Sequence, residues 1–280
     1  MWNLIKKGAC FKISNHEIVK FYLEGNSIAA TGRKFNLTSY KIKKILIENN
    51  IQIRTRHEQN ILENMKRGKA INHNYFDILT LENVYYLGFL AADGTVRPHR
   101  NEIKIGLSSV DKDFLIEFKN NLKSEREIKD YITANGFEVS ELLFSSQKIK
   151  EELSKYSIVP NKTKIGVSFK NIPENFKLAF IKGFFDGDGC FTYNQYTKQC
   201  SVKFTSHTKS ILEEINEYFE NKGKYYQKNY NGICYDLSFS TLPSIEIMNK
   251  FYELDTPCLI RKREKFNDYL NLRIEMTSKS

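Results

Sequence analysis

Apolar side chains are spaced differently in the two parts of the chain. In the N-terminal part, residues 16–24 and 39–50 place apolar residues three or four positions apart, as one face of an amphipathic helix does. Beyond residue 80, stretches with helical spacing enclose stretches in which apolar and polar residues alternate. Ile103, Ile105 and Leu107 alternate in this way, as in a strand with one buried face. These spacings predict an α+β fold preceded by a small all-α domain.

The N-terminal segments carry capping and turn residues in the order expected of a helix-turn-helix. Gly25 ends the first helix, and Ser27 and Thr38 suit the N-caps of the next two. Asn36 can adopt the left-handed conformation needed between those two helices. Residues 27–46 resemble the helix-turn-helix of resolvase-type DNA-binding proteins, whose second helix enters the major groove. The residues expected to face DNA are Ser39, Tyr40, Lys41, Lys43 and Lys44. A small helical bundle that binds protein is the alternative interpretation.

Positive charge is concentrated at the N-terminus. Residues 1–80 contain 14 basic and 6 acidic residues, whereas the remaining 200 contain 29 and 27, within a net charge of +10. Such a segment favours a polyanionic partner, most simply nucleic acid, although a solvated face would look the same. Residues 51–74 are polar and basic and predict a linker with one short helix at 57–67. This linker could lie along a phosphate backbone or serve only as a spacer.

A nine-residue segment occurs twice in the chain. YLGFLAADG at 86–94 matches IKGFFDGDG at 181–189, which places Asp93 and Asp188 95 positions apart. The similarity continues at LSSVDKDFLIEF and FTSHTKSILEEI, so residues 82–270 consist of two copies of one unit. The predicted domains are 1–50 (helix-turn-helix), 51–74 (basic linker), 75–170 (first repeat) and 171–280 (second repeat).

Each copy shows the same order of elements, αββαββα. The predicted helices are 81–92, 111–123 and 146–156 in the first copy and 174–187, 208–221 and 243–253 in the second. The second strand pairs are predicted at 128–134 with 137–144 and at 224–230 with 233–239.

The repeated segment has the composition of a helix that packs closely against its own copy. Gly88 and Gly183 lack a β-carbon, so two helices carrying them can approach until their backbones touch. Pairing the helices would then bring Asp93 and Asp188 together at their C-terminal ends, where two carboxylates repel each other and the helix dipole. Such a pair is costly unless a cation is present, and hard oxygen ligands favour Mg²⁺.

These two segments closely resemble the motif of the LAGLIDADG homing endonucleases, with Asp93 and Asp188 at its eighth position. The resemblance covers about residues 75–270, and the lead-in at 74–94 is similar to the phage and bacterial branch. It implies a monomer with two pseudo-symmetric αββαββα halves, whose sheets lie in the major grooves of double-stranded DNA. Asp93 and Asp188 would be the catalytic residues. With the carbonyls of Ala92 and Gly187 they would bind Mg²⁺, for which Mn²⁺ would substitute.

The resemblance also implies a double-strand break with short 3′ overhangs in a long asymmetric target. The expected DNA contacts outside the N-terminal domain are Arg97, Lys104, Lys129, Tyr131, Lys162, Lys164, Lys203, Tyr226, Lys228 and Arg261. Each of these would also suit a solvated surface. The chain departs from the family at the sixth motif position, where Asp186 is matched by Ala91. The sequence identifies no lysine that would stabilise charge on the phosphate.

Composition excludes several other classes of protein. No apolar run is long enough to cross a bilayer, so we expect no membrane partner and a location in the cytoplasm of a bacterial or phage-infected cell. The five cysteines include no CxxC pair, which argues against a disulfide framework and a four-ligand zinc site.

Two functions remain after this comparison. The first is a site-specific endonuclease that promotes mobility of an intron or of its own gene. The second is a non-cleaving member of the same fold, either a maturase that binds group I intron RNA or a transcription regulator. Retention of both Asp93 and Asp188 favours the nuclease.

Overall fold

The computed structural model describes residues 14–66, 70–229 and 232–277. The chain forms two compact units, Met1–Ala70 and Ile71–Ser280. Within the described residues, no helix combines the length and the apolar character that crossing a membrane requires. Cys10 lies outside the described residues.

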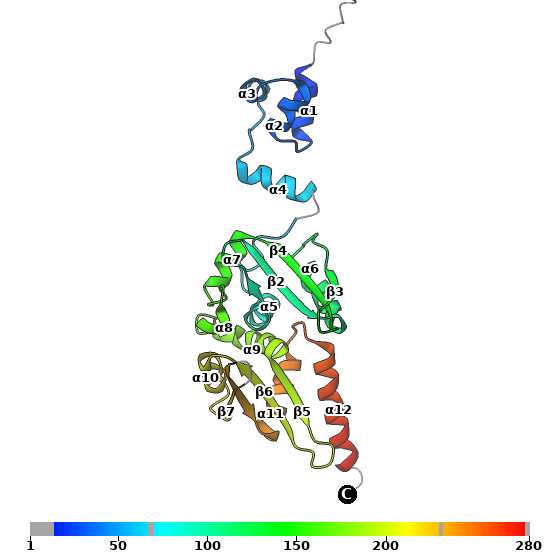
Figure 1. Cartoon of the computed structure of the whole chain (residues 1–280), viewed down its shortest axis with the longest axis vertical. Coiled ribbons are helices and arrows are strands. Elements are labelled where there is room, and N and C mark those ends of the chain that lie inside the picture. The colour runs from blue at the N-terminus through cyan, green and yellow to red at the C-terminus, as the bar shows by residue number, and fades with distance from the viewer. Residues whose placement is uncertain (1–13, 67–69, 230–231, 278–280) are drawn as a thin grey trace, which may run out of the picture. The chain divides into compact units, whose positions relative to one another are not determined.

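Within its described residues, 14–66, the N-terminal unit has four short helices (Figure 1). They are α1 (Asn15–Leu23), α2 (Ile28–Phe35), α3 (Ser39–Glu48) and α4 (Arg56–Lys66). The predicted caps are confirmed: the Ser27 hydroxyl accepts from Ala30 N, and the Thr38 hydroxyl from Lys41 N. Asn36 has φ 54° and ends α2 in the left-handed conformation, as predicted.

This unit continues past residue 50, where the sequence predicts a linker. Arg54 stacks on the Tyr22 ring and donates to the carbonyls of Tyr22 and Asn26, while its own backbone N–H donates to the Tyr22 hydroxyl. In α4, the Gln59 side chain donates to the carbonyl of Gly25. Residues 51–66 are therefore anchored to the helices that precede them.

The second unit contains the two predicted αββαββα repeats (Figure 1). The first comprises α5 (Leu81–Ala92), β1 (Thr95–Val96), β2 (Glu102–Ser108), α6 (Lys112–Asn121), β3 (Lys129–Ile132), β4 (Glu138–Ser145) and α7 (Gln147–Ser154). The second comprises α9 (Glu174–Asp188), β5 (Gly189–Tyr193), β6 (Cys200–Ser206), α10 (Lys209–Tyr218), β7 (Lys224–Asn229), β8 (Ile233–Phe239) and α11 (Thr241–Glu253). Outside the repeat pattern lie the 3₁₀ turn η1 (Ser109–Asp111), α8 (Lys162–Ile165) and α12 (Ile260–Thr277).

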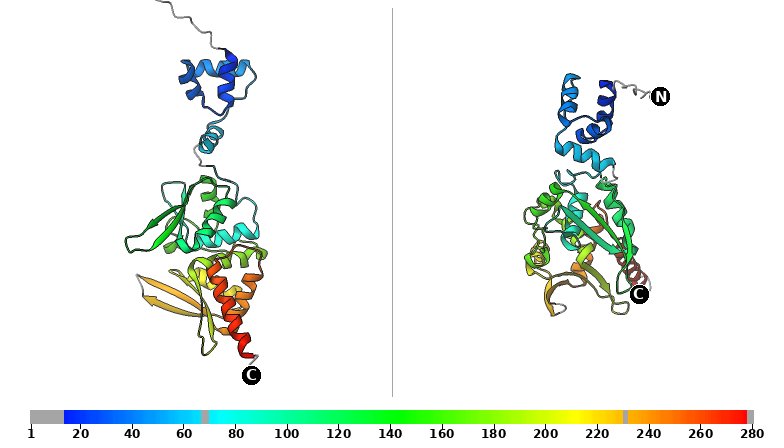
Figure 2. Two further views of the ribbon diagram at one scale, coloured as in Figure 1. Left: turned by 90° about the vertical axis from the view of Figure 1, so that its right-hand side faces the viewer. Right: turned by 45° about the horizontal axis from the view of Figure 1, so that its top comes forward.

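Each repeat has one antiparallel four-stranded sheet, with the orders β1-β2-β4-β3 and β5-β6-β8-β7. One face of each sheet packs on helices, through Ile103 and Phe144 in the first and Val202 and Phe239 in the second. We call the opposite face the outer face of each sheet. The β3–β4 and β7–β8 hairpins project toward the same side of the unit (Figure 2, left).

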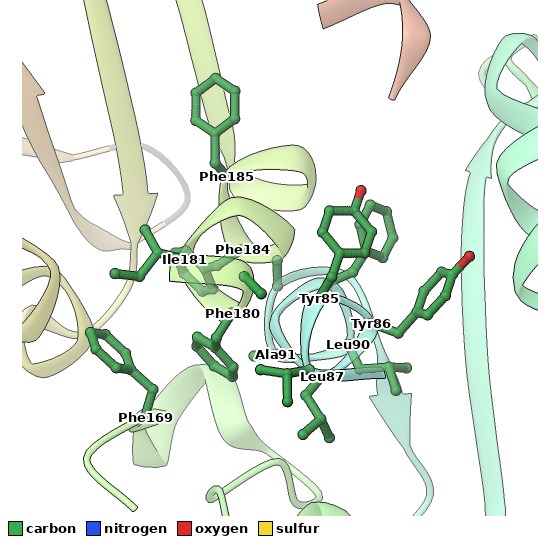
Figure 3. Close-up of a cluster of buried hydrophobic side chains, with 14 of the residues drawn as sticks. Tyr85, Tyr86, Leu87, Leu90, Ala91, Phe169, Phe180, Ile181, Phe184 and Phe185 are labelled. Carbon is green, nitrogen blue, oxygen red and sulfur yellow. The ribbon is translucent and has the colours of Figure 1, made fainter. Parts of the chain in front are cut away.

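Helices α5 and α9 cross at the centre of the unit and join the two repeats (Figure 3). A β-carbon on Gly88 would lie 1.9 Å from the carbonyl oxygen of Phe180, and one on Gly183 would lie 1.9 Å from that of Tyr85. Both separations are far shorter than a van der Waals contact, so the two backbones touch where only glycine fits. This close contact fixes where the two helices end relative to each other.

Candidate functional site: the paired ends of helices α5 and α9

The two motif aspartates lie where the paired helices end. Asp93 is the C-cap of α5, and Asp188 is the last residue of α9. A β-carbon on Gly187 would lie 2.3 Å from the β-carbon of Ala92 and 3.3 Å from Oδ2 of Asp93. The two helix ends are thus in contact, and the carboxylates of opposite repeats are close enough for the charge of Asp188 to act on Asp93.

Both aspartates are held where ionisation is unfavourable. Burial raises the pKa of Asp93 to about 6, and the neighbouring Asp188 adds to the rise. Burial likewise raises the pKa of Asp188, although Lys162 and Lys262 oppose this effect. Asp93 is half-buried and Asp188 is exposed. Two neighbouring carboxylates of like charge make a site that prefers cations.

Lys162 of α8 lies inside this site. Its ammonium group donates a short hydrogen bond to the carbonyl of Ala92. Burial lowers its pKa, and attraction to Asp188 and Asp93 counteracts that shift. The sequence predicted Lys162 as a DNA contact, and the structure places it beside the carboxylates. The carbonyl of Ala92, which was expected to bind a metal, therefore already accepts a hydrogen bond from Lys162.

Lys262 of α12 occupies the matching place at the end of α9, and the sequence analysis did not name it. Its ammonium group donates to the carbonyls of Phe185, Asp186 and Gly189 at 2.6, 2.8 and 2.6 Å. The side chain is 6% exposed, and burial lowers its pKa to about 8. The sequence contains a signal for Lys262. A basic stretch that begins with proline follows each repeat, at 160–164 and 257–265, and Lys262 lies 100 residues after Lys162.

Arg261, the residue predicted from that stretch, has a different partner. Its Nε lies 3.1 and 3.0 Å from the two carboxylate oxygens of Asp111, a residue of the first repeat. The ion pair joins the two repeats beside the site.

Asp186 supports the end of α9 from within the helix interface. Its Oδ2 accepts from the Tyr85 hydroxyl at 2.6 Å and from the backbone N–H of Leu259 at 3.1 Å. It thereby connects α5 to the segment that leads into Lys262. The pseudo-symmetric counterparts of Tyr85 and Asp186 are Phe180 and Ala91, which are both apolar.

The remaining predicted DNA-contacting residues lie on exposed surfaces. The pairing register places six of them on the outer faces of the sheets: Lys104, Lys129, Tyr131, Lys203, Tyr226 and Lys228. Arg97 follows β1 and forms an ion pair with Glu102, and Lys164 is exposed on α8. In the N-terminal unit, the outward side of α3 exposes Ser39, Tyr40, Lys41, Lys43 and Lys44, while Ile42, Ile45 and Leu46 are buried.

The donor set suits a hard divalent cation held partly by the protein. It offers the carboxylates of Asp93 and Asp188, which are oxygen ligands, while the carbonyl of Ala92 already accepts a hydrogen bond from Lys162. Among residues 14–66, 70–229 and 232–277, no group of three or more His, Cys, Asp or Glu side chains could hold a metal ion. A cation bound here would therefore complete its coordination with water or with oxygens of a substrate.

Comparison with known proteins agrees with this geometry. Residues 175–250 match the model of the LAGLIDADG-like domain. An uncharacterized protein of Methanocaldococcus jannaschii is 29% identical over 167 residues, which are 55% of this chain and 56% of that protein. The chain thus spans little more than half the length of this curated relative.

Solved structures with a similar fold include a meganuclease and a LAGLIDADG homing endonuclease. The meganuclease I-SmaMI bound to uncleavable DNA is 15% identical, with a TM-score of 0.50, over 71% of this chain and 92% of that chain. The LAGLIDADG homing endonuclease I-LtrWI bound to target DNA is 18% identical, with a TM-score of 0.47, over 74% and 92%. I-SmaMI bound to uncleaved DNA in the presence of calcium ions is 14% identical, with a TM-score of 0.45, over 72% and 93%.

The matched residues run from α9 into α11 and include the second motif helix and its sheet. The first repeat has the same element order and presents its own motif helix to α9. The chain therefore carries a LAGLIDADG-like domain within the two-repeat fold of the LAGLIDADG homing endonucleases.

Proposed function

We propose that this protein is a site-specific DNA endonuclease that makes a Mg²⁺-dependent double-strand break. The observation that carries the proposal is the contact between the two helix ends that carry Asp93 and Asp188, where the Asp188 charge raises the pKa of Asp93 and one lysine binds each end. A structural role alone would not explain two like charges at the negative ends of two helix dipoles.

The site suits hydrolysis of a phosphodiester. Asp93 and Asp188 would hold Mg²⁺, or Mn²⁺ in its place, and the bound cation would supply a Lewis acid and an acidified water. The ammonium groups of Lys162 and Lys262 lie where they can offset negative charge that develops on the phosphate. Because the pKa of Lys262 is about 8, most of this lysine is charged at neutral pH.

The proposed substrate is double-stranded DNA with a long asymmetric target, cut by a monomer. Two similar but non-identical sheets, with outer faces that carry lysines and tyrosines, would contact the two halves of such a target. In the cytoplasm of a bacterial or phage-infected cell, the break would promote mobility of an intron or of the protein's own gene.

The N-terminal unit supports an additional DNA contact through a helix-turn-helix. Its α3 has an apolar back and an outward side carrying Lys41, Lys43 and Lys44. Replacing these three exposed lysines with Gln should weaken DNA binding and reduce the dependence of log Kd on log salt by about 2 to 3. Fluorescence anisotropy at several salt concentrations measures both quantities. An unchanged salt dependence would refute the role of this helix.

The same unit keeps a second candidate function open, that of a non-cleaving regulator or intron-RNA maturase. Exposing the protein to a plasmid library of random targets separates the functions. The nuclease requires discrete breaks that appear with Mg²⁺, disappear with EDTA, and are lost in Asp93→Asn and Asp188→Asn. Asp113→Asn is the matched control, because this aspartate is exposed on α6. Tight binding of DNA or intron RNA without any break would favour the second function.

A further inference from the structure

The outer face of each sheet carries a lysine held by a carboxylate. In the first sheet, Lys104 donates to Glu141 at 2.9 Å, and the Tyr131 hydroxyl donates to the same oxygen at 3.2 Å. We call these three residues the first cluster. In the second sheet, Lys203 and Lys228 both form ion pairs with Oδ2 of Asp236. These three residues form the second cluster.

The two clusters occupy corresponding positions in the two repeats. Glu141 lies opposite Gly106 in the β2–β4 register, and Asp236 lies opposite Thr205 in the β6–β8 register. The two acids are 95 residues apart, the same offset that separates the motif aspartates. The pseudo-symmetry that relates the motif aspartates thus also relates these two clusters.

The acid of the second cluster has little accepting capacity left for DNA. Asp236 is 1% exposed under its two lysines, and its other oxygen accepts from the Thr205 hydroxyl at 2.8 Å. Burial would raise its pKa, but Lys228, Thr205 and Lys203 together hold the pKa below its ordinary value. Asp236 therefore stays ionised, and the groups it presents to a ligand are the free N–H donors of the two ammonium groups.

A lysine fixed in this way selects its partner differently from a mobile one. A mobile lysine follows phosphates, which carry no sequence information. A nearby carboxylate repels phosphate and holds the ammonium group over the sheet, where the edges of base pairs would lie. In the major groove, guanine presents two adjacent acceptors, O6 and N7, and is the usual partner of a lysine donor.

We propose that the two clusters read guanine at matched positions in the two halves of the DNA target. The proposal rests on the proposed function, because it needs the outer faces to lie in the major grooves. The second cluster has two ammonium groups and can donate to O6 and N7 together. The first has one ammonium group, so its discrimination for guanine is the weaker of the two.

Selection by binding rather than cleavage tests this inference. The whole chain, with Ca²⁺ in place of Mg²⁺, would select its target from random duplexes, and Kd would then be measured on the selected sequence. Replacing the matched guanine with adenine, or with 7-deazaguanine, which lacks the N7 acceptor, should weaken binding about tenfold or more for the second cluster.

Asp236→Asn should remove that discrimination while leaving affinity for altered targets unchanged or higher, because the released lysines can reach phosphates. The dependence on salt should become steeper. Asp130→Asn is the control. Asp130 also binds a lysine, Lys112, and a serine hydroxyl, that of Ser140, but it lies on the helix-packed side of its sheet.

Three results would overturn the inference. The first is a selected target without guanine at matched positions in its two halves. The second is an Asp236→Asn variant that still discriminates against the altered bases. The third is a uniform loss of affinity for every sequence in that variant, which indicates a structural role. Cleavage with Mg²⁺ is scored separately, so a chain that selects guanine but cuts nothing refutes the nuclease and supports this inference.

Discussion

The ends of α5 and α9 carry the same motif but are supported by different interactions. At the end of α9, Lys262 donates to three carbonyls, and Asp186 connects the helix to Tyr85 and Leu259. At the end of α5, the corresponding lysine donates to one carbonyl, that of Ala92. The duplicated motif has therefore kept its acids while the groups around them diverged, so equal sequence at the acids does not imply equal support.

The divergence is a paired exchange across the helix interface. Tyr85 and Asp186 form a polar contact on one side, and their counterparts Phe180 and Ala91 are apolar on the other. Either pair can be buried. In the first pair the two polar groups bind each other, and in the second pair there is no polar group that needs a partner. A mixed pair would leave a buried polar group without its hydrogen bond.

The largest expected effect is on DNA cleavage, to which the aspartates at the two helix ends should contribute equally. Asp93→Asn and Asp188→Asn should each reduce double-strand cleavage by about a thousandfold or more, since each removes a ligand of the cation and a charge from the transition state. Gel analysis of a supercoiled plasmid measures nicked and linear products. If one variant still linearised the plasmid at the native rate, the two acids would not share the reaction.

The next effect should separate the two ends through their lysines. Lys262→Met leaves three carbonyls without their ammonium partner and should cost roughly 3 kcal/mol or more of unfolding free energy. Lys162→Met affects one carbonyl and should cost roughly 1 kcal/mol. Urea unfolding with Lys164→Met as the exposed control provides the measurement. Equal losses from Lys262 and Lys162 would contradict the unequal support of the two ends.

A smaller effect should link stability to pH through Asp93. Because the folded state raises its pKa from 3.8 to about 6, the folded protein binds this proton more tightly than the unfolded chain does. Unfolding free energy should therefore fall as pH rises from about 4 to 6, and the loss persists above that range. At pH 7.5 in EDTA, Asp93→Asn should be more stable than the native chain by roughly 1 to 2 kcal/mol.

Two further measurements sharpen this prediction. Near pH 4, where Asp93 is protonated in the folded protein, the advantage of Asp93→Asn should nearly vanish. At pH 7.5, millimolar Mg²⁺ should reduce the advantage by stabilising the native chain alone. Thermal unfolding across this pH range follows both effects. An advantage that grew toward low pH would show that Asp93 is not the destabilising group.

The smallest expected effect concerns the exchanged pair. Tyr85→Phe removes one hydrogen bond from Asp186 and should cost about 1 to 2 kcal/mol. Phe180 at the corresponding place shows that phenylalanine fits the interface. A double-mutant cycle with Asp186→Ala should therefore recover part of the loss, because the pair then matches Phe180 and Ala91. Additive losses would show that the two side chains act independently.

Much of the architecture was predictable because its signals are local. The caps at Ser27 and Thr38, the turn at Asn36 and the repeated order of elements follow from residues close in sequence. The pairing of the motif helices also follows, because Gly88 and Gly183 indicate backbone contact at matching positions. These features need no knowledge of distant partners.

The features that the sequence did not reveal depend on contacts between distant residues. Lys262 binds the end of α9 from a segment that Asp186 also holds, through Leu259, 73 residues away. Arg54 anchors the predicted linker through Tyr22, a partner 32 residues earlier. The partnership of Lys203 with Asp236 needs the register of β6 and β8, which alternation alone does not fix.

The glycine contact between α5 and α9 has an evolutionary consequence. At Gly88 and Gly183, any side chain would collide with a main-chain carbonyl that has nowhere to move. Drift at these two positions is therefore blocked, while the outer faces of the sheets can accept substitutions without disturbing the core. A lineage with this arrangement can change the outer faces of its sheets while it inherits an unchanged spacing between its two motif aspartates.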